Sequence, residues 1–256
     1  MIFSMLPSHA FSAGAKPDVA LEVTAGYDGI AKLGTYVPYK ILVINKGGAV
    51  DGEVQIEVKL DSYNKTILAK PVSLAEGASK EVVISAPVFT ARRGVKIRFS
   101  SNGKTVRELD YSFRRLLPPE VKTIGVLSGD NSAYDYLNGI MIPWRVDSDH
   151  EEKLKAMMAA GVYPASSVVT VDSVELTQVK EVESVLVPLS SEEFPEKPEE
   201  MSGFDILIIS NFDTSLLTKD QLQTLDNWVK NGGTLVVGTG VNWKKRNACW
   251  TGVQPA

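Results

Sequence analysis

Short runs of alternating apolar and polar residues fill residues 16–115, with turn-forming residues between them. In Asp51–Leu60, apolar side chains stand at Val54, Ile56, Val58 and Leu60, the period of a strand with one buried face. Asn102-Gly103 separates the last two runs and is typical of a two-residue hairpin. We therefore expect strands at Val19–Ala25, Tyr36–Asn45, Asp51–Leu60, Thr66–Leu74, Lys80–Pro87, Val95–Ser100 and Lys104–Phe113.

This spacing, without helices, predicts an antiparallel β-sandwich of immunoglobulin-like type over residues 16–115. The stretch Pro38–Gly47 (PYKILVINKG) resembles, one position out of register, the P-x-x-I-x-V-x-N-x-G strand of bacterial extracytoplasmic modules. That resemblance implies a module that spaces or presents other domains. The tyrosines allow two interpretations, a carbohydrate-binding face or ordinary sandwich packing, and packing is favoured; they are Tyr36, Tyr39, Tyr63 and Tyr111.

The pattern changes after Leu116-Leu117-Pro118-Pro119, which predicts a linker at 116–120 because two prolines end the preceding strand. Beyond it, apolar runs alternate with helical patterns, as in a parallel sheet with crossover helices. A short helix is expected at Ser132–Leu137 and a solvated loop at Ser190–Ser202, which is rich in Glu and Pro. The expected strands are Val121–Ser128, Ser166–Val171, Ser184–Leu189, Phe204–Ser210 and Thr234–Val237.

The helix between the last two strands has the clearest signals in the chain. Thr218 is a predicted N-cap, and Gln221 three residues later completes a capping box. An apolar stripe follows at helical spacing, and Asn231-Gly232-Gly233 ends the helix. The stripe consists of Leu222, Leu225, Trp228 and Val229.

The stretch Gly203–Gly240 (GFDILIISNFDTSLLTKDQLQTLDNWVKNGGTLVVGTG) resembles the class I glutamine amidotransferase-like fold, a flavodoxin-like α/β sandwich, and especially its non-catalytic versions in bacterial envelope proteins. In catalytic members a Cys lies in a sharp turn after a strand and is served by a later His. Here the corresponding turn, Gly238-Thr239-Gly240, has no Cys, and Cys249 lies in no such turn. Both histidines, His9 and His150, lie far upstream of the position of the family's His. The resemblance therefore implies the fold without amidotransferase activity.

The sequence thus predicts two domains: an all-β immunoglobulin-like sandwich, then an α/β flavodoxin-like (class I glutamine amidotransferase-like) three-layer domain. The predicted divisions are a signal-peptide remnant at 1–15, the sandwich at 16–115, the linker at 116–120, the α/β domain at 121–245 and an irregular tail at 246–256. Because the pattern is lost after Lys245, we expect the α/β domain to be incomplete, as in a truncated or frameshifted reading; a natural short tail is the alternative. Full-length relatives of this layout imply a membrane anchor beyond this stretch.

Composition narrows the function classes. A net charge of −4 and a pI near 5.4 argue against a general nucleic-acid binder. The single Cys excludes an intramolecular disulfide framework. The first 15 residues (MIFSMLPSHAFSAGA) are typical of the end of a secretory signal peptide without its basic start, so we expect an extracytoplasmic protein. A disordered apolar tail is the alternative interpretation of this stretch.

Candidate chemistry is sparse. The acidic stretch Asp147–Glu152 contains metal-ligand residue types, but they are consecutive, so an acidic helix start is favoured over a metal site. Arg92-Arg93 and Arg114-Arg115 are interpreted as solvated loop charges rather than a phosphate- or lipid-binding patch. No cofactor, metal site or nucleophile–base pair is identified.

In an open parallel sheet, ligands bind beyond the carboxyl ends of the strands. The polar residues expected there are candidates for a ligand crevice, but loop capping is the favoured interpretation; they are Ser128, Asp130, Asn211, Asp213, Thr239 and Asn242. We therefore expect a non-enzymatic module of a bacterial cell-envelope protein that contacts other envelope proteins. A hydrolase, or a carbohydrate-binding protein using this crevice, is the alternative.

Overall fold

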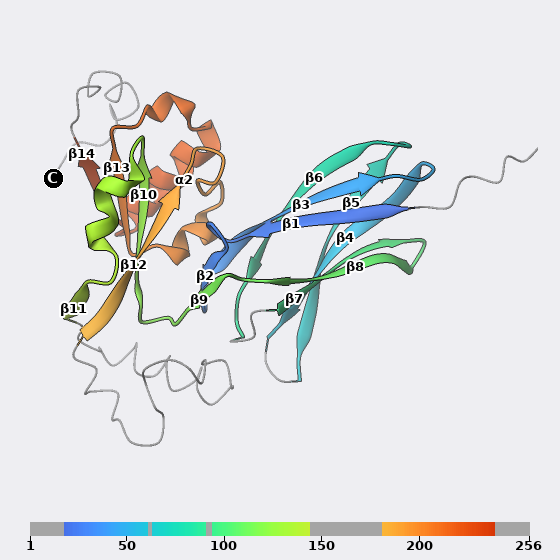
Figure 1. Ribbon diagram of the computed structural model, residues 1–256, viewed down its shortest axis with the longest axis horizontal. Coiled ribbons are helices and arrows are strands. Elements are labelled where there is room, and N and C mark those ends of the chain that lie inside the picture. Colours follow the sequence, from blue (N-terminus) through green and yellow to red (C-terminus); the bar gives the residue numbers. More distant parts are fainter. Residues whose placement is uncertain (1–17, 61–62, 91–93, 144–180, 239–256) are drawn as a thin grey trace, which may run out of the picture.

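The computed structural model describes residues 18–60, 63–90, 94–143 and 181–238. Strands dominate these residues, and Figure 1 shows them as two units. We call the first unit, β1 to β9, the sandwich, and the second, from β10 to β14, the parallel-sheet unit. The seven predicted strands of the immunoglobulin-like sandwich are all present.

The sandwich consists of two facing antiparallel sheets. One has the strand order β1-β3-β6 and the other β5-β4-β7-β8. Each sheet contributes one face to a shared core, as in an immunoglobulin-like fold. The strands are β1 (Val19–Ala25), β3 (Tyr36–Asn45), β4 (Val50–Lys59), β5 (Lys65–Leu74), β6 (Ser79–Pro87), β7 (Gly94–Ser101) and β8 (Lys104–Ser112).

The alternation in β4 determines which of its residues enter the core. Val54, Ile56 and Val58 are buried, as predicted. Leu60, expected on the same face, lies beyond the end of β4 and is 40% exposed. The predicted hairpin turn is also present: Asn102 and Gly103 both have positive φ, 50° and 71°, as a type I′ turn requires.

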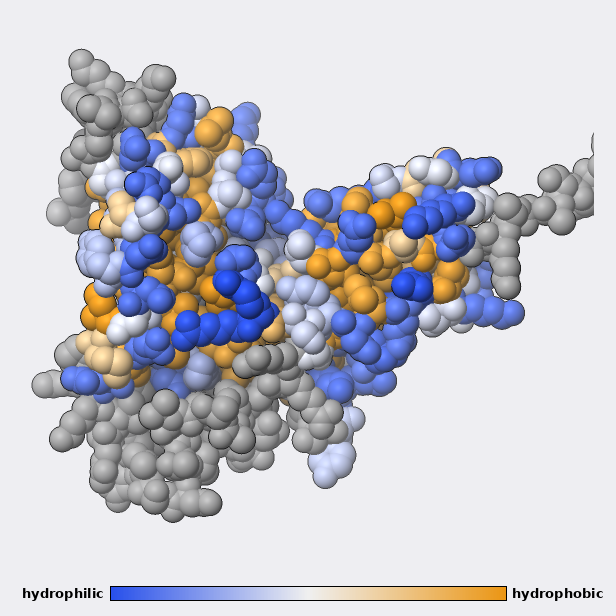
Figure 2. Space-filling model, in the orientation of Figure 1, coloured by the Kyte–Doolittle hydropathy of each residue, from blue (hydrophilic) through white to orange (hydrophobic). Residues whose placement is uncertain are grey.

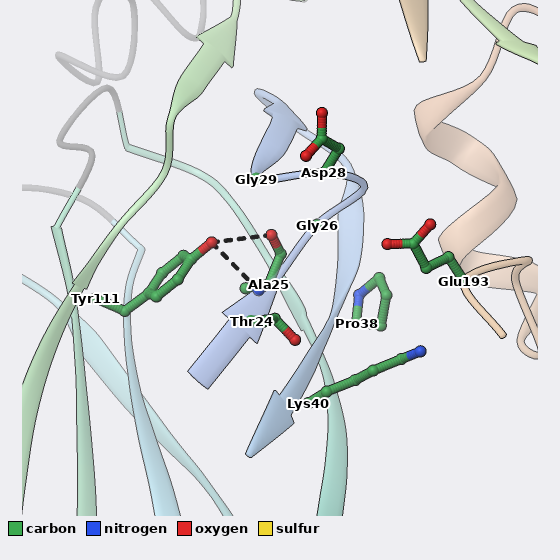
Figure 3. A pocket seen from close by; sticks show the side chains of 9 residues that line it. All are labelled: Thr24, Ala25, Gly26, Asp28, Gly29, Pro38, Lys40, Tyr111 and Glu193. Atoms are coloured by element: carbon green, nitrogen blue, oxygen red, sulfur yellow. Dashed lines mark hydrogen bonds between the residues drawn. The ribbon is translucent and has the colours of Figure 1, made fainter. Parts of the chain in front are cut away.

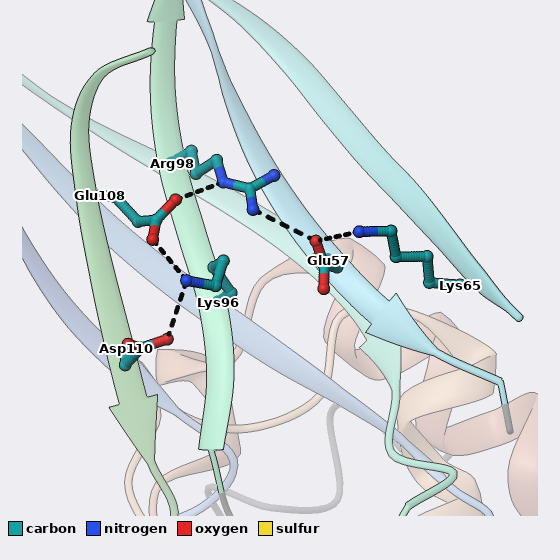
Figure 4. Close-up of polar contacts among 6 residues, drawn as sticks. All are labelled: Glu57, Lys65, Lys96, Arg98, Glu108 and Asp110. Carbon is teal, nitrogen blue, oxygen red and sulfur yellow. Dashed lines mark hydrogen bonds and ion pairs between the residues drawn. The ribbon is translucent and has the colours of Figure 1, made fainter. Parts of the chain in front are cut away.

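The outer face of the four-stranded sheet carries a chain of ion pairs across all four strands (Figure 4). Three cations alternate with three anions, so this face is hydrophilic without net charge. Glu57 is 8% exposed, and the other five side chains are 23–72% exposed. The pairs among these exposed side chains contribute little to stability, and this network gives no basic surface for nucleic acid. The pairs are Lys65–Glu57 (3.0 Å), Arg98–Glu57 (3.3 Å), Arg98–Glu108 (2.6 Å), Lys96–Glu108 and Lys96–Asp110 (3.7 Å).

The parallel-sheet unit has the strand order β11-β12-β10-β13-β14. The pairings of β12, β10, β13 and β14 are parallel, and β11 is an antiparallel edge that the pattern did not predict. The expected strand Ser166–Val171 lies outside the described residues. The strands are β10 (Lys122–Ser128), β11 (Met141–Pro143), β12 (Glu181–Leu189), β13 (Ile206–Ser210) and β14 (Thr234–Gly238).

Helices lie on both faces of this sheet. On one face, the apolar stripe of α2 (Lys219–Lys230) packs on β10, β12 and β13. On the other face, Tyr134 and Leu137 of η1 (Asn131–Leu137) pack on a smaller cluster. The helix expected at Ser132–Leu137 is therefore a 3₁₀ helix. A further 3₁₀ turn, η4 (Thr214–Leu216), precedes α2.

The predicted capping box of α2 is confirmed. The Gln221 amide donates to the Thr218 hydroxyl at 3.2 Å, and the Thr218 amide donates to the Gln221 side chain at 2.9 Å. We expect Thr218→Ala to lower the free energy of unfolding by about 1 kcal/mol, because it leaves a helix-terminal amide without its acceptor. Urea unfolding measures this loss. Thr218→Ser keeps the hydroxyl and should retain most of the stability; an equal loss in both variants would contradict the capping role.

A short two-stranded parallel sheet lies where the sandwich meets the second unit. β2 (Ile30–Lys32) pairs in parallel with β9 (Arg115–Leu117), and neither strand was predicted. Leu116 and Leu117, assigned to the linker, thus belong to β9, and the two prolines follow it.

Candidate functional site

The candidate crevice was predicted at the carboxyl ends of the parallel strands. Ser128 and Ser210 end β10 and β13 and are register partners, so the loops that follow lie side by side. These loops contain Asp130, Asn211 and Asp213. Thr239 and Asn242 lie outside the described residues, so their part of the crevice stays a prediction.

The two aspartates of the described crevice accept hydrogen bonds from residues of their own loops. One Asp130 carboxylate oxygen accepts from the Ser132 amide and hydroxyl at 3.2 and 2.6 Å. Asp213 accepts from the Ser215 amide and hydroxyl at 3.1 and 2.7 Å. Both carboxylates therefore cap 3₁₀ helices, η1 and η4. These contacts agree with the favoured capping interpretation.

A more extensive arrangement lies at the junction of the two units, which the sequence pattern did not predict. Tyr27, Ile30 and Leu117 come from the sandwich side of the chain, yet they belong to the core of the parallel-sheet unit. The Tyr27 and Phe204 ring centroids lie 4.7 Å apart, and the Tyr27 hydroxyl donates to the Glu200 carbonyl at 3.3 Å. Burial, together with the Glu200 carboxylate, raises the pKa of Tyr27 well above its ordinary value.

A tight turn presents Tyr27 to that core. Gly26 has φ +70°, and a Cβ there would meet the carbonyl oxygen of Ile30. Only glycine fits this position without strain. The Gly26 amide donates to the Pro38 carbonyl at 3.0 Å, which anchors the turn to β3.

The predicted solvated loop Ser190–Ser202 is wrong in part, because it forms the other side of the junction. Phe194, Glu200 and Met201 are buried, and Pro198–Gly203 forms the 3₁₀ helix η3. The Glu200 carboxylate accepts from the Ser85 hydroxyl of β6 and from its own loop. The prediction of a solvated loop rested on its Glu and Pro content. The available signal for burial was its two isolated apolar residues, Phe194 and Met201.

A carboxylate shared by two lysines lies at the same junction. Lys32 of β2 and Lys122 of β10 approach Asp205 at 2.7 and 3.0 Å, and the Thr123 amide donates to it at 2.8 Å. Burial lowers the pKa of Lys32, although Asp205 opposes this effect. Burial acts to raise the pKa of Asp205, but Lys32, the Thr123 amide and Lys122 together hold it below its ordinary value.

This lowered pKa gives a pH dependence with a definite sign. Ionised Asp205 stabilises the folded state at pH values above its unfolded pKa of about 3.9, and that contribution is lost as pH falls through the lower folded pKa. We expect the urea midpoint to fall between about pH 5 and pH 3, and to fall less in Asp205→Asn. Equal slopes in the two proteins would contradict the assignment.

The remaining predicted sites have structural explanations. The tyrosines do not share one face: Tyr39 is buried against Tyr111 and Phe113, whereas Tyr63 is 96% exposed, so the packing interpretation holds for Tyr39 and Tyr111. Arg114 and Arg115 both form ion pairs, Arg114 with Asp28 at 2.5 Å and Arg115 with Glu183 at 3.5 Å. Arg92-Arg93 and Asp147–Glu152 lie outside the described residues.

The residues that the structure describes give two findings on ligands and membranes. They contain no group of three or more His, Cys, Asp or Glu side chains placed to hold a metal ion. No helix within these ranges combines the length and apolarity that crossing a membrane requires.

Comparison with known proteins finds one family model that matches the sandwich. Residues 18–114 match a domain of unknown function, DUF8726, and this range contains β1 (from Val19) to β8 (to Ser112). No curated protein matches the chain.

Similar solved structures include a β-glucosidase from Listeria innocua in complex with glucose (12% identity, TM-score 0.29) and β-glucosidase 3B from Thermotoga neapolitana in complex with glycerol (16%, 0.27). These matches cover 40% and 38% of this chain but only 16% of either enzyme. The CARDB domain of a Pyrococcus furiosus protein in complex with di-metal ions is 17% identical, with a TM-score of 0.30, over 40% of this chain and 94% of that one. At these values the likenesses carry no functional argument.

Proposed function

We propose that the chain is a non-enzymatic module of a bacterial cell-envelope protein, acting outside the cytoplasm in contact or assembly with other envelope proteins. The observation that carries the proposal is the buried junction. Tyr27 seated in the second core, Glu200 bonded to Ser85 and Asp205 shared by Lys32 and Lys122 all cross between the units. A module whose units are fixed to each other presents its surfaces in one orientation, which suits assembly.

Within this proposal, the parallel-sheet unit is a flavodoxin-like domain of the non-catalytic class I glutamine amidotransferase-like type. Its order β12-β10-β13-β14 agrees with the 2-1-3-4 part of the flavodoxin-like order. The resemblance of Gly203–Gly240, and the lack of a Cys in its Gly238-Thr239-Gly240 motif, support the same assignment. The capping roles of Asp130 and Asp213 favour a structural use of the crevice loops.

The test follows the protein in the bacterium that encodes it. The tagged chain, expressed from its own locus, should fractionate with the cell envelope, and a cross-linker that does not enter cells should join it to a defined envelope protein. Asp205→Asn, which loosens the junction, should reduce that cross-link severalfold. The exposed control Asp226→Asn should not. Recovery in the cytosol, or turnover of a substrate by the purified protein, would overturn the proposal.

A further inference from the structure

A cavity of about 260 Å³ lies between the two units, on the side of β1 and β3 (Figure 3). Most of its wall comes from the sandwich: the end of β1 and its turn, Pro38 and Lys40 of β3, and Tyr111 of β8. Glu193, from the loop after β12, supplies the remaining wall. The second unit therefore completes the wall of the cavity. Its volume is below the roughly 300 Å³ at which drug-sized sites begin, so it suits a smaller molecule.

Three charged side chains line this wall, and they differ in whether they can still bind a ligand. Asp28 is held by Arg114 at 2.5 Å, which neutralises it. Lys40 donates to the carbonyl of Glu192 at 2.5 Å, and an ammonium group has two further hydrogens to donate. Glu193 accepts from the Ser190 hydroxyl at 3.1 Å, and a carboxylate has further lone pairs. One cation and one anion thus face the cavity without neutralising each other.

The rest of the wall fixes the position of these two charges. The Tyr111 hydroxyl bonds to both the amide and the carbonyl of Ala25, at 3.2 and 3.1 Å, so it braces the wall. The bond from Lys40 to the Glu192 carbonyl ties β3 to the loop that carries Glu193. Figure 3 shows Glu193 and Lys40 on the side of the cavity opposite Tyr111.

We propose that this cavity binds a small zwitterion, a molecule with an ammonium and a carboxylate group on a short chain. The ligand ammonium pairs with Glu193 and its carboxylate with Lys40, as charge-assisted hydrogen bonds. A simple amine leaves Lys40 without an anion, and a simple carboxylate places its charge near Glu193. A neutral sugar uses neither charge. This site is independent of the proposed function, because an assembly module does not require it.

Titration calorimetry on the whole chain tests the proposal with matched probes. The zwitterion is 5-aminopentanoate, and 1-aminopentane, pentanoate and glucose serve as comparisons. We expect saturable binding of 5-aminopentanoate, at least about tenfold tighter than any of the other three. Absence of saturable binding at millimolar concentration overturns the site. Equal or tighter binding of the amine, the carboxylate or glucose overturns the assignment of ligand class.

Substitutions locate the binding. Glu193→Gln and Lys40→Met should each weaken binding of 5-aminopentanoate about tenfold or more. Glu199→Gln removes the same charge from an exposed side chain of η3 that does not line the cavity, and should leave binding unchanged. Lys40 also ties the units together, so Glu193→Gln, with an unchanged unfolding midpoint, decides the outcome. Binding that survives Glu193→Gln overturns the proposal.

Discussion

Replacing Tyr27 with Ala should lower the free energy of unfolding by about 3–5 kcal/mol, the usual cost of deleting a buried aromatic side chain. Tyr27 is 4% exposed, and its ring lies against Phe204 in the second unit. The loss should also separate the unfolding of the two units, because the deleted ring belongs to the core that joins them. Trp228 packs against the core of the second unit, so in a protein that keeps only this tryptophan, with Trp144, Trp243 and Trp250 replaced by Phe, fluorescence follows that unit, while far-UV circular dichroism follows mainly the strands of both.

We expect the two signals to coincide in urea unfolding when Tyr27 is in place and to diverge in Tyr27→Ala. Tyr27→Phe should cost only about 1 kcal/mol, because it removes the hydrogen bond to the Glu200 carbonyl and keeps the ring. Tyr136→Ala, at a side chain that is 70% exposed, should change stability little. A Tyr27→Ala protein as stable as Tyr136→Ala would contradict the proposed role of the ring.

Replacing Asp205 with Asn should cost about 3 kcal/mol at neutral pH, because it leaves Lys32 buried without its anion. Lys32 is 9% exposed, and Asp205 is its partner at 2.7 Å. The same carboxylate pairs with Lys122 and accepts from the Thr123 amide, so one substitution removes the anion shared by two lysines at the junction.

The matched control is Asp226→Asn, which breaks the i,i+4 pair with Lys230 on the surface of α2. That pair should contribute about 0.3–0.5 kcal/mol. Chemical denaturation of both variants at one pH gives the comparison. Equal losses of unfolding free energy in the two variants would contradict the claim that the burial of Lys32 increases the contribution of Asp205 to stability.

The parts of the fold that depend on local periodicity could be predicted from the sequence. The alternation in β4 indicated a buried face, and Asn102-Gly103 indicated its hairpin because both positions need positive φ. Thr218 and Gln221 marked the start of α2 because the capping box is a contact over three residues.

The junction could not be predicted, because its contacts join residues far apart in the chain. Tyr27 meets Phe204, and Ser85 meets Glu200, and no local pattern encodes such pairs. The same holds for the cavity, whose Lys40 and Glu193 come from different units. Figure 2 shows apolar residues on the surfaces of both units. Single-sequence patterning assigns these two units to separate domains.

Among the described crevice residues, Ser128 ends β10 and Asp130 follows it, while Asn211 and Asp213 follow β13, as predicted. The capping roles of Asp130 and Asp213 agree with the interpretation that the sequence favoured, because such caps are contacts over two residues.

The contacts at the junction predict that the sandwich and the parallel-sheet unit form one rigid body. Double electron–electron resonance tests it directly, with spin labels at Arg107→Cys on β8 and Lys219→Cys at the start of α2, both exposed positions. The native Cys249 is replaced by Ser so that only these two sites are labelled. A rigid junction predicts a single narrow distance distribution in this protein and a broader one after Tyr27→Ala. A broad distribution with Tyr27 in place would contradict the claim.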